Sequence, residues 1–314
     1  MPHNEFHEPI EDILRQTPSQ TEWGVAALGS NGDVVFDLGG SVPFEALSIA
    51  KLGIDLAGQQ LEIGNPEVTL RPEDIRPGNG VLQYFPEGYT MGYADAERLA
   101  LSISDNTASR MMTRTMGGPH AVNEALSDSP IGDAFERTGL VPTDPHDTAP
   151  TARYFHGDTT PVEAAILMRE VVKYPPAAEA LSRSDFQYGM RRYLDGGPET
   201  IRDRGYDLDV GTIKNAHERG IFVPDVVYDR VLSHRYPAGI ILTKEGTDDD
   251  DDPNLGGQRH EVAQIGAHTV SAFSRKYDYL IGETPYHPAH NVHAAIGEVF
   301  RSSFSDAAHE AADK

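Results

Sequence analysis

The run PFEALSIAKLGIDLA, residues 43–57, constrains the fold of this chain more than any other stretch. Most of it predicts a single helix, with Ser48 in the first turn. The residues that follow Ser48 are apolar on nearly every side, and a helix without a polar face is usually buried. The rest of the chain must therefore surround this helix with other elements.

Lys51 is the one basic residue of this run. Helical spacing places it on the same face as Ser48, with Cβ atoms about 5–6 Å apart. A buried amine loses its proton more easily and can then activate a serine hydroxyl as a nucleophile. The free N–H groups of a helix N-terminus can also bind a developing oxyanion. Two alternatives remain open: a serine-x-x-lysine match by chance, and a lysine whose charged end reaches solvent.

Composition excludes several other kinds of chemistry. The 314 residues suggest one large domain or two smaller ones, and none is cysteine. Disulfides, thiolate metal sites and cysteine nucleophiles are therefore excluded. The histidines show no metal-ligand spacing, so we expect no metal and no cofactor.

The chain is strongly acidic, with a formal net charge of −23. Such a surface repels nucleic acid and anionic membranes, and it is typical of proteins adapted to high salt. An ordinary acidic cytosolic protein is the alternative. The N-terminus has neither a basic start nor an apolar core of a signal peptide, and no apolar run approaches membrane-spanning length. We therefore expect a cytoplasmic protein without a membrane partner.

The pattern along the chain predicts strands at both ends and helices between them. Residues 22–29 and 34–38 predict two strands joined by an Asn31-Gly32 turn. Helices are predicted within 95–103, 106–116, 120–126, 161–172 and 178–194, and Asp158 or one of the threonines after it is predicted to cap the fourth of these. Strands follow at 209–217, 223–229 and 238–243, then an acidic loop at 247–252, an amphipathic helix at 261–274 and a last helix at 292–300.

This order predicts an α+β fold in which one antiparallel sheet is built from both ends of the chain. Residues 1–45 and 205–278 form the lobe that contains the sheet and its flanking helices. Residues 46–204 form a large all-helical lobe inserted into it, and residues 279–314 form a C-terminal extension. A cleft is expected where the two lobes meet.

Two further motifs accompany Ser48 and Lys51: Ser104-Asp105-Asn106 on a turn between helices, and Lys214 on a predicted strand. With this order and spacing the chain resembles the class A β-lactamases and the wider family of penicillin-recognising serine hydrolases. Gly117-Gly118-Pro119 and the helix start Gly157-Asp158-Thr159-Thr160-Pro161 extend the likeness, as does the predicted closing helix near 260–275. It covers roughly residues 10–277 and implies a β-lactamase/transpeptidase-like fold.

The resemblance also implies a role for each matching residue. Ser48 would be acylated, Lys51 would take or relay its proton, and Ser104 would pass a proton to the leaving nitrogen. Asn106 would hold the substrate amide. Lys214 and Asn215 would also bind the substrate, and Lys214 would pair with the carboxylate of the substrate. The oxyanion hole would consist of the backbone N–H groups of Ser48 and His217.

The sequence departs from the family pattern at two places. The third motif, lysine followed by threonine or serine and then glycine, is here Lys214-Asn215-Ala216. The region that matches the omega loop, roughly 138–157, contains no glutamate to activate a deacylating water. Asp144, His146 and Asp147 are the candidates left to replace it.

We therefore expect a serine hydrolase of class A β-lactamase type that acylates Ser48 with a small-molecule or peptide-like amide or ester. A carboxypeptidase- or esterase-like enzyme on the same fold is the first alternative. The second is a binding protein that keeps the cleft but has lost catalysis.

Overall fold

The computed structural model describes residues 6–15, 17, 19–129, 157–182, 241–248, 257–276, 280–281, 284–285, 292–293, 295–297 and 299–300. The helices are α1 (His7–Arg15), α2 (Ala50–Gln60), α3 (Tyr93–Ser102), α4 (Asn106–Thr115), α5 (Pro119–Ser127), α6 (Pro161–Val171) and α7 (Pro175–Ser182), with 3-10 turns η1 (Leu47–Ile49), η2 (Pro72–Asp74) and η3 (Leu82–Tyr84). The strands are β1 (Glu22–Leu28), β2 (Val34–Leu38), β3 (Phe44–Glu45), β4 (Glu67–Thr69), β5 (Thr90–Gly92), β6 (Asp158–Thr159), β7 (Ile241–Asp248), β8 (Gln258–Ile265), β9 (His268–Arg275), β10 (Leu280–Ile281) and β11 (Thr284–Pro285). Within these ranges, no helix has the length and apolar character needed to cross a membrane.

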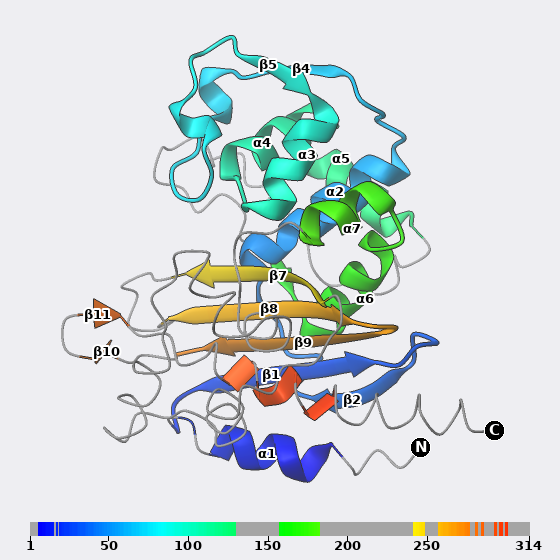
Figure 1. Cartoon of the computed structure of the whole chain (residues 1–314), viewed down its shortest axis with the longest axis vertical. Coiled ribbons are helices and arrows are strands. Elements are labelled where there is room, and N and C mark those ends of the chain that lie inside the picture. The colour runs from blue at the N-terminus through cyan, green and yellow to red at the C-terminus, as the bar shows by residue number, and fades with distance from the viewer. Residues whose placement is uncertain are drawn as a thin grey trace.

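Five strands form the main sheet in the order β2-β1-β9-β8-β7, and every neighbouring pair is antiparallel (Figure 1). The pairing of β1 with β9 joins the two ends of the chain in one sheet, which confirms the predicted α+β fold. The predicted hairpin between β1 and β2 is also confirmed. Gly32 lies at its turn with a φ of 93°, a conformation that glycine adopts at little cost.

Helices cover the sheet on both faces. On one face Ile10 and Ile13 of α1, with Phe6 just before it, pack against apolar side chains of β1, β2, β8 and β9. Residues 292–293, 295–297 and 299–300 are helical, as predicted, and they bury Val292, Ile296 and Phe300 in the same cluster. Part of the segment that the sequence analysis treated as a C-terminal extension therefore contributes to the core of the sheet lobe.

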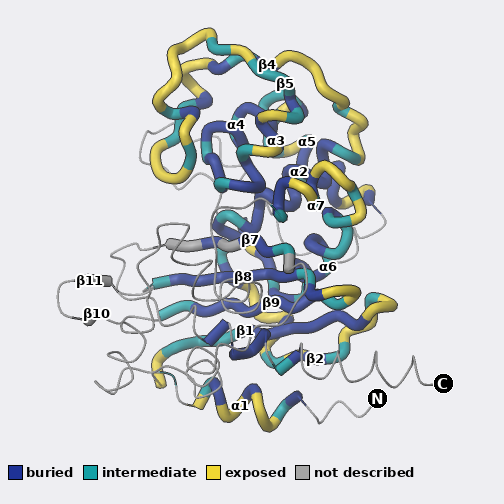
Figure 2. The backbone as a smooth tube through the Cα atoms, viewed as in Figure 1, coloured by how far each residue is buried: buried dark blue, intermediate teal, exposed yellow. Residues whose placement is uncertain are grey.

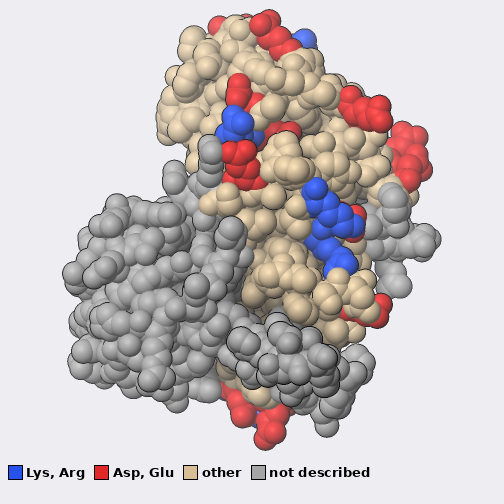
Figure 3. All heavy atoms as spheres, turned by 45° about the vertical axis from the view of Figure 1, so that its right-hand side comes forward, with Lys and Arg blue, Asp and Glu red and all other residues tan. Residues whose placement is uncertain are grey.

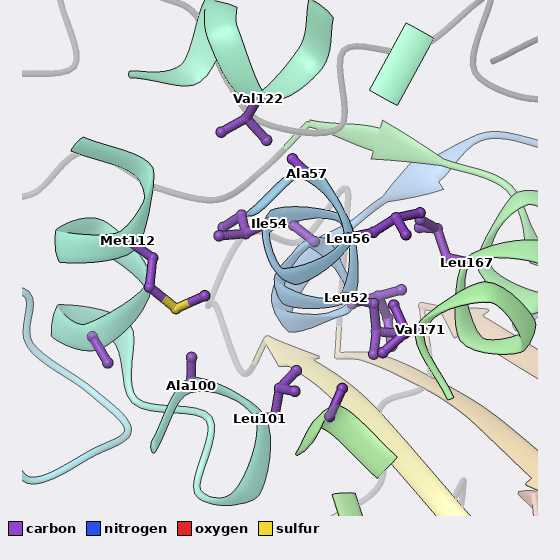
Figure 4. Packing of buried hydrophobic residues seen from close by; sticks show 14 of the residues in the cluster. Leu52, Ile54, Leu56, Ala57, Ala100, Leu101, Met112, Val122, Leu167 and Val171 are labelled. Atoms are coloured by element: carbon purple, nitrogen blue, oxygen red, sulfur yellow. The ribbon is translucent and has the colours of Figure 1, made fainter. Parts of the chain in front are cut away.

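On the other face α6 lies against β1, β8 and β9, and the helical lobe continues from it (Figure 1). Helix α2 runs through the middle of this lobe, and nine of its residues, from Ala50 to Gly58, are buried. Leu52, Ile54 and Leu56 point in different directions toward surrounding helices (Figure 4), and the tube in Figure 2 shows most of α2 in dark blue. The predicted burial of this apolar helix is therefore confirmed.

One predicted element is wrong. Residues 261–274, including the closing helix expected near 260–275, are not helical but form strands β8 and β9 around a turn at Gly266, whose φ is 59°. Both strands lie inside the sheet and are buried on both faces, so their sequences lack the alternation of a half-exposed strand. The apolar residues of 261–274 also recur at helical spacing, which explains why the sequence predicted a helix.

Two smaller corrections concern the ends of elements. The run 43–57 does not begin as a helix, because Phe44 and Glu45 form β3 and pair with Thr159 and Asp158 of β6. Asp158 is exposed on that strand and does not cap α6. The cap is Thr160, whose hydroxyl accepts from the N–H of Glu163 while the Glu163 carboxylate accepts from the N–H of Thr160.

Several predictions lie outside the described residues. These are the strands 209–217 and 223–229, the part of the helix 178–194 beyond Ser182, and nearly all of the region 138–157. The strand predicted at 238–243 overlaps β7, which continues through Lys244 to Asp248.

A buried ion pair gives a test of the helical lobe. The Arg114 side chain on α4 donates two hydrogen bonds of 2.8 Å to the fully buried carboxylate of Asp74, and one of 2.7 Å to the carbonyl of Thr69. Replacing Arg114 with methionine leaves Asp74 buried without its cation. We expect the free energy of unfolding in urea to fall by about 3 kcal/mol.

Arg98→Met is the matched control, because Arg98 pairs with Asp95 on the exposed side of α3. Exposed pairs of this kind contribute less than about 1 kcal/mol. Equal losses in the two variants would show that burial of Asp74 does not determine the cost.

Candidate active site

The backbone at Ser48 is set by Leu47, which has a φ of 49° although it is neither glycine nor asparagine. Branched residues rarely adopt this left-handed conformation, and such strain concentrates at functional sites. Leu47 is buried and Ser48 is half-buried, so the turn presents the Ser48 hydroxyl at a partly open surface while its neighbours are fixed in the core. Helix α2 begins two residues later, so unpaired N–H groups of its first turn lie close to Ser48.

The amino group of Lys51 lies within hydrogen-bond distance of three polar side chains. Its Nζ lies 2.7 Å from Ser48 Oγ, 3.1 Å from Ser104 Oγ and 2.9 Å from Asn106 Oδ1. The side chain is 1% exposed, so it does not reach solvent. Burial, and next the nearby charge of Lys244, hold the pKa of Lys51 well below its usual value against an opposing effect of Asp105. Lys51 can therefore act as a neutral amine, which is what a base for Ser48 requires.

Ser104 lies on a tight turn whose conformation is fixed by its own backbone and by the next residue. It has a φ of 56° and is 2% exposed. The next residue, Asp105, caps α4 by accepting from the N–H of Ala108 at 2.9 Å. Its other carboxylate oxygen accepts from the N–H groups of Val81 and Leu82 at 2.7 and 2.9 Å. Asp105 therefore fixes the turn that carries Ser104 and also ties the loop before η3 to it.

That loop also positions Asn106. The backbone N–H of Asn106 donates to the carbonyl of Asn79 at 3.0 Å, and its side-chain Nδ2 donates to the carbonyl of Pro77 at 3.0 Å. Because Nδ2 is used in this way, Oδ1 is the atom left to face Lys51. Gly80 has a φ of 107°, and a Cβ there would come within 2.2 Å of the Asp105 carboxyl carbon, so the close approach of this loop depends on a glycine.

A second lysine reaches the site from the sheet. Lys244 of β7 is 2% exposed, and its Nζ lies 3.0 Å from Ser104 Oγ. Two residues on, Gly246 lies so close to the turn at Ser48 that a Cβ would be 2.8 Å from Leu47 Cβ and 3.1 Å from the backbone nitrogen of Ser48. Among the described strands, β7 is an edge of the five-stranded sheet, so N–H groups on its outer side are not used by those strands. The N–H of Ser48 and the edge of β7 therefore lie side by side.

These contacts define where the protons lie. A neutral amine has two N–H donors and one lone pair. Lys51 can donate to Ser104 and Asn106 and accept the hydroxyl proton of Ser48. Ser104 then accepts from both Lys51 and Lys244, so its own O–H is free to donate toward a bound molecule. The arrangement provides an activated hydroxyl at Ser48 and a proton donor at Ser104.

The charge around this site contrasts with that of the whole chain, whose net charge is −23. Figure 3 shows acidic side chains along the outer edges of the helical lobe on one face, with fewer basic ones between them. Lys51 and Lys244 instead place two amino groups in the interior beside Ser104. Among the described residues no cluster of histidine and carboxylate side chains could hold a metal ion.

The structure brings together four of the predicted site residues: Ser48, Lys51, Ser104 and Asn106. The other three, Lys214, Asn215 and His217, lie outside the described residues, so their predicted roles are not tested here. The candidates for a deacylating base, Asp144, His146 and Asp147, lie outside them as well.

The sequence analysis missed Lys244, which is the lysine that the structure places at Ser104. A signal was present: Lys244-Glu245-Gly246 keeps the glycine of the family's third motif, which Lys214-Asn215-Ala216 lacks. The predicted strand ends at Thr243, one residue before Lys244, and therefore does not include it.

A pair of matched variants tests which lysine belongs to the site. We expect Lys244→Ala to lower the rate of covalent labelling of Ser48 by a negatively charged β-lactam at least tenfold, because it removes a charge-assisted hydrogen bond to Ser104, worth about 1.5–3 kcal/mol. We expect Lys214→Ala to leave that rate within about twofold, because Lys244 already places a cation at Ser104. Intact-protein mass against time measures both rates, and the reverse result would assign the site to Lys214.

Comparisons with known proteins agree with this arrangement. The model of the "Beta-lactamase enzyme family" matches residues 5–217. No curated protein matches the sequence. Many solved structures match the fold.

Three of these structures show the extent of the likeness. PBP-A has a TM-score of 0.61 at 16% identity, over 96% of this chain and 97% of its own. A class A β-lactamase from Bacteroides cellulosilyticus DSM 14838 has a TM-score of 0.65 at 14% identity, over 98% of this chain and 99% of its own. A β-lactamase from Sphaerobacter thermophilus DSM 20745 has a TM-score of 0.59 at 16% identity, over 96% and 98%.

At these identities the structures establish the fold and no specific activity. The family match covers well over half of the chain and includes Ser48, Lys51, Ser104 and Asn106. The chain therefore belongs to the beta-lactamase enzyme family and has the fold of the class A-like serine β-lactamases and penicillin-binding proteins.

Proposed function

We propose that this protein is an acyl-transferring serine hydrolase, which forms an acyl-enzyme at Ser48 from an amide or ester substrate that carries a carboxylate. The contact that carries this proposal is the 2.7 Å separation between Lys51 Nζ and Ser48 Oγ, in a place where burial favours the neutral amine. A hydroxyl with a base at this distance is the arrangement required for nucleophilic catalysis.

The acylation step follows from the positions of the protons. Ser48 Oγ attacks the carbonyl carbon of the substrate, and its proton passes to Lys51. The oxyanion is bound by the N–H of Ser48 and by an N–H on the outer edge of β7, beside Gly246. Ser104 gives its proton to the leaving nitrogen or oxygen as the carbonyl bond to that atom breaks, and Lys51 returns a proton to Ser104.

The substrate class follows from charge. Lys244 places a cation beside Ser104, on the side of the site where the leaving group must lie. In a chain as acidic as this one, such a cation favours a substrate with a carboxylate near the bond that is cleaved. β-Lactams and peptides with a free C-terminus both have this feature.

Hydrolysis of the acyl-enzyme needs a base that activates water. The region 138–157 contains no glutamate, so we propose that deacylation is slow compared with acylation. Among the structural relatives, a PBP-A variant is described as an acyl-enzyme complex with penicillin G. A long-lived adduct of that kind is the outcome we expect here, with a carboxypeptidase- or esterase-like reaction as the alternative to rapid β-lactam turnover.

Mass spectrometry with burst kinetics tests the proposal. We expect a chromogenic cephalosporin to give a burst of about one equivalent per protein molecule, followed by slow turnover, and an adduct at Ser48. Ser48→Ala should abolish both signals, because the Ser104 hydroxyl, which also lies beside Lys51, is bonded to Lys244 as well and serves as the proton donor. Ser127→Ala, a change at an exposed position at the end of α5, is the control. Adduct formation that survives in Ser48→Ala would reject the assignment.

The pH dependence of acylation tests the role of Lys51. The base must be neutral, so the acylation rate should rise with pH and level off at a pH well below 10.5, the usual pKa of lysine. Stopped-flow measurement of the burst phase between pH 5 and 10 gives this profile. Lys51→Arg, which stays protonated, should lose acylation at every pH. A rate in wild type that keeps rising to the pKa of an unperturbed lysine would contradict a buried neutral amine.

A further inference from the structure

Two carboxyl groups face each other in the interior of the helical lobe, behind the site. Asp55 of α2 is 1% exposed and Glu97 of α3 is 6% exposed. Asp55 lies one helical turn after Lys51, and Glu97 lies on the helix that ends just before Ser104. The acylation chemistry described above uses neither group, yet burying two carboxylates together is costly.

The buried carboxylate of Asp55 lacks a hydrogen-bond donor among the described residues. Neither of its carboxylate oxygens accepts a hydrogen bond from an N–H or hydroxyl group of another described residue. After burial, the charge of Glu97 and a side-chain hydrogen bond with its carboxyl are the causes that raise the pKa of Asp55, so the two carboxyl groups are neighbours. Two carboxylates have no hydrogen between them, so this bond exists only when one of the pair is protonated.

Among the described residues, few groups around Asp55 and Glu97 could supply a hydrogen-bond donor or a positive charge in place of that proton. On α3, the Tyr93 hydroxyl is buried and has no hydrogen-bond partner among the described residues, and Arg98 acts on Glu97 from the exposed side, where it pairs with Asp95. The residues that α4, α5 and α7 bury around α2 and α3 are uncharged. Glu163 of α6 is used in the cap at Thr160, and Lys51 lies on α2 itself, bonded to Ser48, Ser104 and Asn106.

We propose that Asp55 and Glu97 share a single proton at neutral pH, and that this acid–carboxylate hydrogen bond fastens α2 to α3 in a pH-dependent way. The bond joins the helix that follows the nucleophile to the helix that leads to Ser104. When the proton is lost, two like charges remain between the helices and the contact becomes repulsive.

The sign of the pH dependence follows from the proton count. Burial is the largest cause that raises the pKa of Asp55 well above its usual value, and burial also raises the pKa of Glu97. Above the ordinary carboxyl range the folded pair holds one proton that the unfolded chain has lost. The contribution of this pair to the free energy of unfolding is therefore greatest at low pH, and it falls as the pH rises toward the raised pKa.

The double variant Asp55→Asn/Glu97→Gln provides the test. The two amides can hydrogen-bond to each other without a titrating proton, so the variant keeps the contact and loses its pH dependence. We expect the ratio of the unfolding equilibrium constants, wild type over double variant, to rise about tenfold per pH unit above the ordinary carboxyl range until the pair loses its proton. Urea unfolding at a series of pH values measures this ratio, and contributions from Lys51 cancel because both proteins contain it.

Asp95→Asn is the matched control, since Asp95 is an exposed carboxylate on the same helix and should give a ratio that does not change with pH. If the ratio of wild type over double variant also stays constant with pH, the proposal is overturned. A wild-type stability that depends on the concentration of Na⁺ or K⁺ in place of pH would also overturn it, because a cation would then hold the pair. Infrared absorption of a protonated carboxyl, present in wild type at neutral pH and absent from the double variant, provides a readout that does not require unfolding.

Discussion

The site depends on one physical constraint, which is that the amino group of Lys51 lies in the interior with hydroxyl and amide groups as its partners. An isolated buried ammonium would be costly, and the contacts to Ser48, Ser104 and Asn106 supply hydrogen bonds without supplying a negative charge. Asp105, whose charge acts on Lys51, already accepts from three backbone N–H groups. Burial, and next the charge of Lys244, therefore keep the pKa of Lys51 low against the opposing charge of Asp105.

This constraint explains why the surrounding backbone is so strictly fixed. The partners of Lys51 come from separate elements, and a neutral amine beside a hydroxyl is useful only if their distance is held. Leu47 and Ser104 both keep left-handed backbone conformations, and Gly80 and Gly246 allow close approaches that a Cβ would prevent. The well-packed core around α2 over-determines these strained positions.

Sequence reasoning found the elements whose signals are local. The hairpin at Asn31-Gly32, the apolar helix after Ser48 and the Ser104-Asp105-Asn106 turn each have a short-range physical signature. It failed where the signal depends on the tertiary environment: β8 and β9 are buried on both faces and so lose the period of a strand. Lys244-Glu245-Gly246 does keep the glycine of the family's third motif, but the strand pattern ends at Thr243. Only the folded chain shows that β7 continues through Lys244 and brings it to Ser104.

The same argument applies to Asp55 and Glu97. In the sequence Asp55 interrupts an apolar helix and Glu97 lies among ordinary helical polar residues, so neither indicates that the two will meet. Once α2 and α3 are packed, each carboxyl group removes the other from water, and the pair must resolve the repulsion by keeping a proton. The helix that carries an amine without its proton at Lys51 would then carry, one turn further on, an acid that retains one. Both are consequences of burying ionisable groups in a helix that has no polar face.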